Sequence, residues 1–317
     1  MHETLNEQEL GNSCQMSFFG SLGYCLFTSS TFTFVIADGS KIFFGGCDNK
    51  VSAWDLGSNQ AQPFGQHNAP VKSVVFLAEM NMAISGSWDQ TIKFWDFRSN
   101  GPIFTLSYNH KILALECAGP LMVAGFSDRQ LAHYNLAKLP QMGQSFREEK
   151  MYESPFKNQI RCLSIFSEKN GYAAGSTEGR CAIKYVDLNQ QTYVQSKEDF
   201  AFKCHRVGAS QNTSQPQEVY SVNSIAFAGR HPHSFATAGS DGNFIFWDKN
   251  AKSKLKGFGR KPNPVVATHF DMNSNLFAYA LAYDWSRGAS GYCKQDNNTV
   301  GIYLHATPDE EIRPKRK

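Results

Sequence analysis

The sequence predicts an all-β protein built from a small sheet that is repeated along the chain. Three observations support this class. Segments that end in Trp-Asp or a similar pair recur at intervals of about 40 residues, for example at Trp54-Asp55 and Trp95-Asp96. These segments alternate apolar and polar residues with a period of two, which is typical of strands. Aromatic residues, which favour strands, are abundant: the chain has 25 Phe, 12 Tyr and 5 Trp.

Each repeat has the same internal order. An apolar strand leads into a tight turn that contains Asp or Glu, and a second strand follows with an aromatic residue near its end. Five copies share this order, and their turn acids and terminal aromatics are Asp48 and Trp54, Asp89 and Trp95, Asp128 and Tyr134, Glu178 and Tyr185, and Asp241 and Trp247. A sixth copy, from "SNLFAYALAYDWSRG" to "NNTVGIYLH", has a long insert in its turn.

A further strand is expected ahead of several of these pairs. The candidates are VKSVVF (71–76), IRCLSIF (160–166), VNSIAF (222–227) and VVATHF (265–270). A period near 40 with GSxD and Trp-Asp marks is typical of WD repeats, in which each copy forms one four-stranded propeller blade. The sequence therefore predicts a WD40 β-propeller with six recognisable blades.

One blade contains a set of polar residues that is interpreted as structural. His67, Ser85, Asp89 and Trp95 stand where WD blades place a buried hydrogen-bonded tetrad. The turn carboxylate is expected to accept from the histidine, and the indole N–H to donate to the hydroxyl. An unpaired buried polar group costs on the order of 1–3 kcal/mol, so such residues need partners.

The N-terminal segment differs from the repeats. Residues 10–37 carry no charged side chain and are long enough to span a bilayer. However, Ser, Thr and Gly dilute the stretch, and its leader "MHETLNEQE" is acidic where a signal peptide would be basic. An atypical, strand-forming N-terminus is therefore favoured over a membrane segment, and no membrane insertion is expected.

Composition argues against a metal site and against catalysis. The eight cysteines form no Cys-x-x-Cys pair and no Cys/His zinc spacing, so no metal or other cofactor is expected. They are interpreted as reduced thiols of a nuclear or cytosolic protein. No repeat combines paired carboxylates, a Ser-His pair or a metal cluster, so the protein is not expected to be an enzyme. The net charge of +3 is too small to imply nucleic-acid binding by itself.

The first departure from the repeat is an overlong connection, "FAFKCHRVGASQNTSQPQEVY" (200–220). Its tail, rich in Ser, Asn, Gln and Pro, is interpreted as a loop, whereas "FKCHR" is compact, aromatic and basic. Lys203 and Arg206 can pair with acidic groups of a partner, and arginine offers a bidentate fork. A solvated loop with two charges is the alternative.

The second departure is "AYDWSRG" (282–288), which replaces the plain turn of the other blades. Trp285, with Arg287 two positions later, offers a stacking platform beside a cation, which suits a nucleotide base or a peptide side chain. Packing of Trp285 against its own insert is the competing explanation.

The third departure is basic. Residues 249–261, "KNAKSKLKGFGRK", contain six Lys or Arg and no acid, and a strip of this kind near Trp285 can follow a phosphate backbone. A solvated charge run is the alternative. The end of the chain, "RPKRK" (313–317), is interpreted as a disordered tail that can serve in nuclear import or contact phosphates.

These motifs make the chain similar to the messenger-RNA export factors of eukaryotes, a family of WD-repeat propellers associated with the nuclear pore. The motifs are specific and run from about Ala37 to the basic end: "DGSKIFFGGCDNKVSAWDLGSNQ", "QHNAPVKSV", "GSWDQTIKFWD", "ESPFKNQIRC", "GSTEGR", "FKCHR", "PQEVYSVNSIAF", "GSDGNFIFWDK" and "FAYALAYDWSRG". The paralogous spindle-checkpoint propeller shares the SWD and KCHR features. "GSDGNFIFWDK" and "YDWSRG" resemble the export factors and not that paralogue.

The resemblance implies a seven-bladed propeller without enzymatic activity. It implies binding of a short acidic-hydrophobic segment of the GLFG-repeat nucleoporin, with Arg206 matching the family's arginine for nucleoporin glutamates and Lys203 beside it. It also implies an RNA-binding patch formed by Trp285 and Arg287, with Phe244 joining it. The implied locations are the nucleus, the nuclear pore and envelope, the cytoplasm and, in mitosis, the spindle.

One departure from the family concerns the number of blades. The family carries an additional N-terminal blade ahead of "DGSKIFF", whereas six units are found here. Seven blades need roughly 280–315 residues, and 272 residues lie between Ala37 and Pro308. Either residues 16–36 supply substitute strands or a blade is missing. The expected domains are an atypical segment (1–35), the propeller (36–306) and a basic tail (307–317).

The function expected from these features is a scaffold in mRNA export that links RNA or a messenger ribonucleoprotein to the nucleoporin. The alternative is a spindle-checkpoint adaptor that binds checkpoint-kinase segments through the same KCHR surface.

Overall fold

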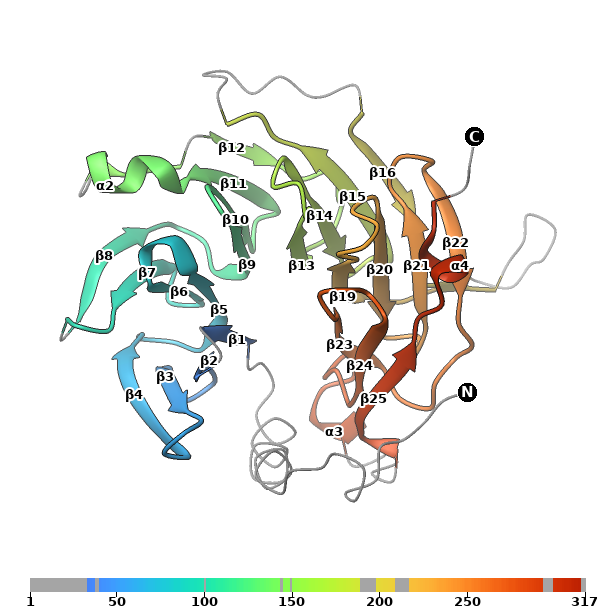
Figure 1. Cartoon of the computed structure of the whole chain (residues 1–317), viewed down its shortest axis with the longest axis horizontal. Coiled ribbons are helices and arrows are strands. Elements are labelled where there is room, and N and C mark those ends of the chain that lie inside the picture. The colour runs from blue at the N-terminus through green and yellow to red at the C-terminus, as the bar shows by residue number, and fades with distance from the viewer. Residues whose placement is uncertain are drawn as a thin grey trace. The chain divides into compact units, whose positions relative to one another are not determined.

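The computed structural model describes residues 33–37, 40–99, 101–142, 145–148, 150–188, 198–208, 217–292 and 299–314. The chain divides into two compact units. We call residues 28–165 with 186–195 the N-terminal unit, and residues 166–185 with 196–317 the C-terminal unit. Each unit is built from small antiparallel sheets (Figure 1).

The N-terminal unit contains three four-stranded sheets in which neighbouring strands in the sequence are paired. The first sheet has β1 (Thr33–Ala37), β2 (Lys41–Gly45), β3 (Lys50–Asp55) and β4 (Gln60–Gln66). The second has β5 (Val71–Leu77), β6 (Met82–Ser87), β7 (Thr91–Asp96) and β8 (Pro102–Ser107). The third has β9 (Ile112–Ala118), β10 (Leu121–Phe126), β11 (Gln130–Asn135) and β12 (Lys150–Glu153), and β13 (Ile160–Ile165) ends the unit.

The second strand of a sheet is buried on both faces. All six residues of β6 are buried, and so are all six of β10. Side chains from β5–β7 and β9–β11 form one apolar cluster, which shows that these sheets pack face to face. A Cβ on Gly86 would come within 2.7 Å of Ile112 Cγ2, so only glycine permits this close approach. The "GS" of the repeat therefore serves the packing of one blade on the next.

The C-terminal unit repeats this plan. One sheet contains β14 (Gly171–Ser176), β15 (Arg180–Tyr185) and β16 (Phe200–Lys203); the next contains β19 (Val222–Phe227), β20 (Ser234–Gly239), β21 (Phe244–Asp248) and β22 (Ser253–Gly257). The last has three strands, β23 (Val265–Phe270), β24 (Leu276–Leu281) and β25 (Gly301–Ala306). A two-stranded ribbon joins β17 (Arg206–Val207) to β18 (Glu218–Val219), and the short helix α3 spans Ala289–Tyr292.

The predicted fold class is confirmed: the described residues are arranged as six propeller blades, and the repeats found in the sequence are the sheets of the structure. The N-terminal boundary differs from expectation. Strand β1 begins at Thr33 and pairs with β2, so the first blade takes its first strand from the uncharged stretch. Residues 1–32, including the rest of that stretch, lie outside the described residues.

The C-terminal boundary also differs. Residues 309–312 form helix α4 (Asp309–Ile312), and Ile312 is fully buried in the apolar cluster of the last two blades. Ser234 Oγ donates to the Ile312 carbonyl at 2.6 Å, and His231 Nε2 lies 2.7 Å from Asp309 Oδ1. The expected tail therefore begins after this helix, and its last residues, 315–317, lie outside the described part.

Candidate functional site

The predicted tetrad of the second blade is present. His67 Nδ1 lies 2.9 Å from Asp89 Oδ2, and His67 Nε2 lies 2.7 Å from Ser85 Oγ. Trp95 Nε1 donates to the same Ser85 oxygen at 2.7 Å. The four side chains are buried between strands and turn, so their role is structural, as predicted.

The direction of each hydrogen bond in the tetrad follows from its chemistry. An indole N–H only donates, so Ser85 accepts from Trp95. Burial favours the neutral imidazole of His67, and the Asp89 carboxylate, which only accepts, places the ring proton on Nδ1. His67 Nε2 then accepts from the Ser85 hydroxyl. Burial lowers the pKa of His67, and the Asp89 carboxylate offsets part of this effect. Burial would raise the pKa of Asp89, but hydrogen bonds from Thr91 and from the Asn68 amide outweigh it and hold that pKa below its usual range.

A second tetrad lies in the C-terminal unit and was missed from the sequence. His205 Nδ1 lies 2.9 Å from Asp241 Oδ1, its Nε2 lies 2.9 Å from Thr237 Oγ1, and Trp247 Nε1 donates to Thr237 Oγ1 at 2.9 Å. His205 is the histidine of "FKCHR", which the sequence suggested as a binding motif. The available signal was a histidine upstream of "GSD" and "WD", as in the second blade.

Arg206, the predicted nucleoporin-binding arginine, is half-buried and held by the backbone. Its Nη2 donates to the Glu178 carbonyl at 2.8 Å and its Nε to the Gly179 carbonyl at 3.3 Å. Its Nη1 also donates to Gln217 Oε1 at 3.3 Å. A guanidinium has five N–H donors, so these three contacts leave two for another acceptor. The turn between β14 and β15 therefore holds the Arg206 guanidinium in place, and no acidic side chain among the described residues pairs with it.

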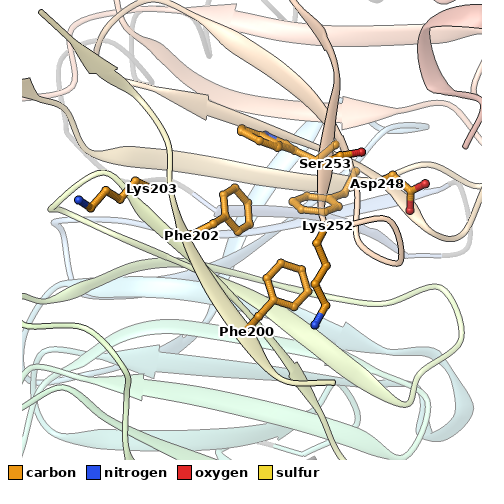
Figure 2. A pocket seen from close by; sticks show the side chains of 8 residues that line it. Phe200, Phe202, Lys203, Asp248, Lys252 and Ser253 are labelled. Atoms are coloured by element: carbon orange, nitrogen blue, oxygen red, sulfur yellow. The ribbon is translucent and has the colours of Figure 1, made fainter. Parts of the chain in front are cut away.

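Lys203, the predicted neighbour of Arg206, is exposed at the end of β16 and belongs to a small pocket (Figure 2). The pocket has a volume of about 120 Å³. Aromatic side chains from three strands line it, together with Lys203 and with polar residues at or next to the β21–β22 turn. The lining residues are Phe200, Phe202, Lys203, Phe235, Trp247, Asp248, Lys252 and Ser253.

Turns and connections of the C-terminal unit meet on one face. Arg206 contacts the β14–β15 turn, and the Ser221 carbonyl after β18 accepts from Ser240 N in the β20–β21 turn. Ser240 Oγ in turn donates to Asp284, which precedes Trp285 in the connection after β24. A continuous chain of contacts thus runs from Arg206 to Trp285, and both lie on the same face of this unit.

Trp285 and Arg287 lie in a turn that is stabilised by two hydrogen bonds of the Tyr283 hydroxyl. The Tyr283 hydroxyl accepts from Arg287 N at 3.0 Å and donates to the Gly288 carbonyl at 2.8 Å. Trp285 has a positive φ of 60°, an uncommon backbone conformation for a bulky residue, and its half-buried ring lies 5.6 Å from that of Tyr283. The Arg287 side chain is exposed. The turn therefore presents part of an indole face beside a cation; residues 293–298 of the insert lie outside the described residues.

The prediction for Phe244 is wrong. Its side chain is fully buried, with ring centroids at 4.2 Å from Phe258, 5.0 Å from Phe277 and 5.0 Å from Tyr279. As the first residue of β21 it faces the core between the last two blades. It packs in the core beneath the face that carries Arg206 and Trp285, and it has no exposed surface with which to contact RNA.

The basic stretch 249–261 does not form one strip. Lys249 is buried, its ammonium 3.0 Å from Glu168 Oε2 and 4.7 Å from the Phe166 ring centroid. It lies in the β21–β22 turn, at the opposite end of β21 from the β20–β21 turn. Arg260 and Lys261 do reach the face that carries Arg206: Arg260 lies 5.8 Å from the Tyr220 ring centroid, and Lys261 N donates to the Gly242 carbonyl at 2.8 Å.

The described residues include no group of three or more His, Cys, Asp or Glu side chains that could hold a metal ion. None of the helices described is both long and apolar enough for a membrane span.

Comparison with known proteins places these features in a family. The family model described as "WD domain, G-beta repeat" matches residues 58–96. The chain is 38% identical over 280 residues to "mRNA export factor GLE2" of Chaetomium thermophilum, with 88% of this chain and 74% of that protein covered. It is 40% identical to "Protein Rae1" of Drosophila melanogaster, with 88% and 77% covered. It is 36% identical to "Poly(A)+ RNA export protein" of Schizosaccharomyces pombe, with 88% and 75% covered.

A solved structure supports the fold alone. The computationally designed Ika8 protein superposes with a TM-score of 0.57 at 16% identity, and the match covers 87% of this chain and 71% of that one. Together with the WD tetrads and the turn-lined face, the sequence identities show that this chain belongs to the mRNA export factor family of WD-repeat β-propellers.

Proposed function

We propose that this protein is a non-enzymatic binding scaffold in nuclear mRNA export, which links RNA or a messenger ribonucleoprotein to a GLFG-repeat nucleoporin. Three relatives carry mRNA export or poly(A)+ RNA export in their names. The proposal places the protein in the nucleus, at the nuclear pore and in the cytoplasm, and on the spindle in mitosis.

The observation that supports the nucleoporin site best is the arrangement of Arg206. Backbone carbonyls of Glu178 and Gly179 hold its guanidinium, so little side-chain entropy remains to be lost on binding. The two remaining N–H donors suit a carboxylate of an acidic segment, and charge-assisted pairs of this kind are strong. Lys203 adds a second positive charge near the same segment.

The test is the affinity of the acidic-hydrophobic nucleoporin segment for Arg206→Glu. Truncating a buried charge pair typically costs 2–5 kcal/mol, so we expect binding to weaken by about 30-fold or more in isothermal titration calorimetry. Arg206→Lys keeps the charge but loses the fork, and should bind weakly while it remains folded. Arg147→Glu, which changes an exposed arginine of the N-terminal unit, is the matched control. An affinity of Arg206→Glu equal to that of the unaltered protein would refute the assignment.

RNA is proposed to bind the neighbouring turn through Trp285 and Arg287. Base stacking on an indole contributes about 1–3 kcal/mol per base, so Trp285→Ala should weaken single-stranded RNA binding by about 5- to 150-fold. Removal of Arg287 should reduce the slope of log affinity against log salt by about 0.7, because one phosphate contact is lost. Arg98→Ala, an exposed arginine of the N-terminal unit, is the control. A flat salt response of the unaltered protein would count against phosphate contacts.

The rival assignment is a spindle-checkpoint adaptor. It shares the Arg206 surface, because the stretch "KCHR" resembles both export factors and the checkpoint propeller. A pull-down that compares nucleoporin and checkpoint-kinase peptides separates the two, since capture of the kinase peptide alone would favour the adaptor.

A further inference from the structure

The pocket beside Lys203 has a rigid aromatic wall (Figure 2). Phe200 and Phe202 project from the same side of β16, because they are two residues apart in a strand. The Phe202 ring lies 4.6 Å from that of Trp247 and 6.3 Å from that of Phe235. Trp247 is fixed by its hydrogen bond to Thr237 in the second tetrad. The wall is therefore preformed and needs no rearrangement to accept a ligand.

The rim of the pocket is positively charged. Lys203 and Lys252 both line the pocket, and both side chains are exposed. The Lys203 ammonium points away from the aromatic rings (Figure 2). The Lys252 ammonium lies 4.7 Å from the Phe200 ring centroid. Asp248 also lines the pocket, but it is buried and its Oδ1 accepts from the amides of Asn250 and Ala251. Two exposed lysines thus lie next to an apolar floor, a combination that favours an apolar side chain with acidic neighbours.

We infer that this pocket anchors one apolar side chain of the acidic segment that Arg206 binds. The inference rests on the proposed function and specifies how the same segment is recognised. Phe200 and Arg206 are six residues apart, and an extended chain rises about 3.3 Å per residue, so the two points are separated by at most about 20 Å. A single extended segment of about seven residues spans them. The anchor residue should therefore lie within about six residues of the carboxylate that Arg206 binds.

The volume limits the anchor to one side chain. A pocket of about 120 Å³ is below the 300–1,000 Å³ typical of small-molecule sites, so a separate small ligand is not favoured. Anchors of this kind often contribute more than 1 kcal/mol to a protein–peptide interface. Acidic residues next to the anchor would meet Lys203 and Lys252.

The first experiment measures fluorescence anisotropy of the labelled nucleoporin segment with Phe200→Ala and with Lys252→Glu. We expect each variant to weaken binding about tenfold, because an apolar contact or a favourable charge is lost. Phe200 is preferred to Phe202, which packs on Trp247 and supports the fold. The matched controls are Lys254→Glu, an exposed lysine of β22 outside the pocket, and Ile302→Ala, an exposed apolar residue of β25. Both controls should bind like the unaltered protein.

The second experiment locates the anchor by a double-mutant cycle. Each large apolar residue of the segment is replaced by alanine in turn, and each peptide is titrated against the unaltered protein and against Phe200→Ala. For one residue within about six positions of the critical acid, the two changes together should weaken binding no more than either alone. Additive losses at every apolar position would overturn the inference, even if Phe200→Ala weakens binding.

The outcomes separate this inference from the proposed function. If Arg206→Glu abolishes binding while Phe200→Ala and Lys252→Glu leave it unchanged, the nucleoporin site stands and the anchor pocket is wrong. If the segment does not bind the unaltered protein, both are wrong. A thermal melt of each variant shows whether a loss of affinity reflects a loss of fold.

Discussion

At the scale of single residues, the polar tetrads explain why an indole and a carboxylate recur at fixed positions. Each tetrad converts four groups that would be costly to bury into a closed chain of donors and acceptors, from Trp95 through Ser85 and His67 to Asp89. The chain is complete only if the histidine is neutral. A buried imidazole that must stay neutral makes stability depend on pH.

The pH dependence has a definite sign. Burial lowers the pKa of His67 in the folded protein, while an unfolded histidine binds a proton near pH 6.5. Below that pH the unfolded chain binds more protons, so the stability provided by His67 is present above about pH 6.5 and lost on acidification. Asp89 and Lys93 are the charged groups that act on His67. The lowered pKa of Asp89 adds a loss of stability at lower pH, as the carboxylate is protonated below its usual value near 3.8.

The measurement is the free energy of unfolding in urea between pH 7.5 and pH 5. One proton contributes a slope of at most about 1.4 kcal/mol per pH unit. We expect His67→Gln to be less stable at pH 7.5 but to have a shallower slope, because the titrating group is gone. Equal slopes for the two proteins would show that His67 is not held neutral by the fold.

At the scale of elements, short segments outside the repeats are tied into the sheets. Helix α4 places Ile312 in the core, and its acids meet histidines: His231 Nε2 lies 2.7 Å from Asp309, and His305 Nε2 lies 2.7 Å from Glu311. Arg313 also donates to Asp309 at 2.6 Å. This helix therefore covers the apolar cluster of the last two blades.

Ile312→Ala should destabilise the protein by about 2–5 kcal/mol, with a value near the lower limit if the chain end opens locally. Urea unfolding and hydrogen exchange of residues 307–314 measure the two effects. Glu310→Ala changes an exposed side chain of the same helix and should leave both almost unchanged. If the two variants behave alike, burial of Ile312 does not hold the helix in place.

At the scale of the whole molecule, the repeat made the fold predictable. Its strands, acidic turns and tetrad follow from local spacing, so six blades and the residues around His67 could be found without a structure. The face that carries Arg206 and Trp285 followed from where the pattern was interrupted. Features that depend on distant partners could not be found in this way. Strand β1 lies in an apolar stretch without repeat marks, and Ile312 stands among charged residues that suggest a solvated tail.

Errors at the candidate site have the same origin. Phe244 follows a surface turn in the sequence, but the next blade covers it. Lys249 belongs to a run of positive charges, but Glu168, 81 residues earlier, pairs with it. Burial by a neighbouring sheet is a tertiary effect and leaves no mark within a few residues of the side chain. The second tetrad is a different case: its histidine and carboxylate are 36 residues apart, but the repeat marks around them could have revealed it.

The position of His205 affects how mutagenesis of this region must be interpreted. An alanine scan across "FKCHR" would identify His205 as a binding hot spot. Its ring, however, is buried and hydrogen-bonded to Thr237 and Asp241, so it cannot contact a ligand. The loss of binding would then result from destabilisation of the blade and not from the loss of a contact with the ligand. A measurement of folding is therefore needed beside each binding measurement, because it separates a residue that stabilises the blade from one that contacts the ligand.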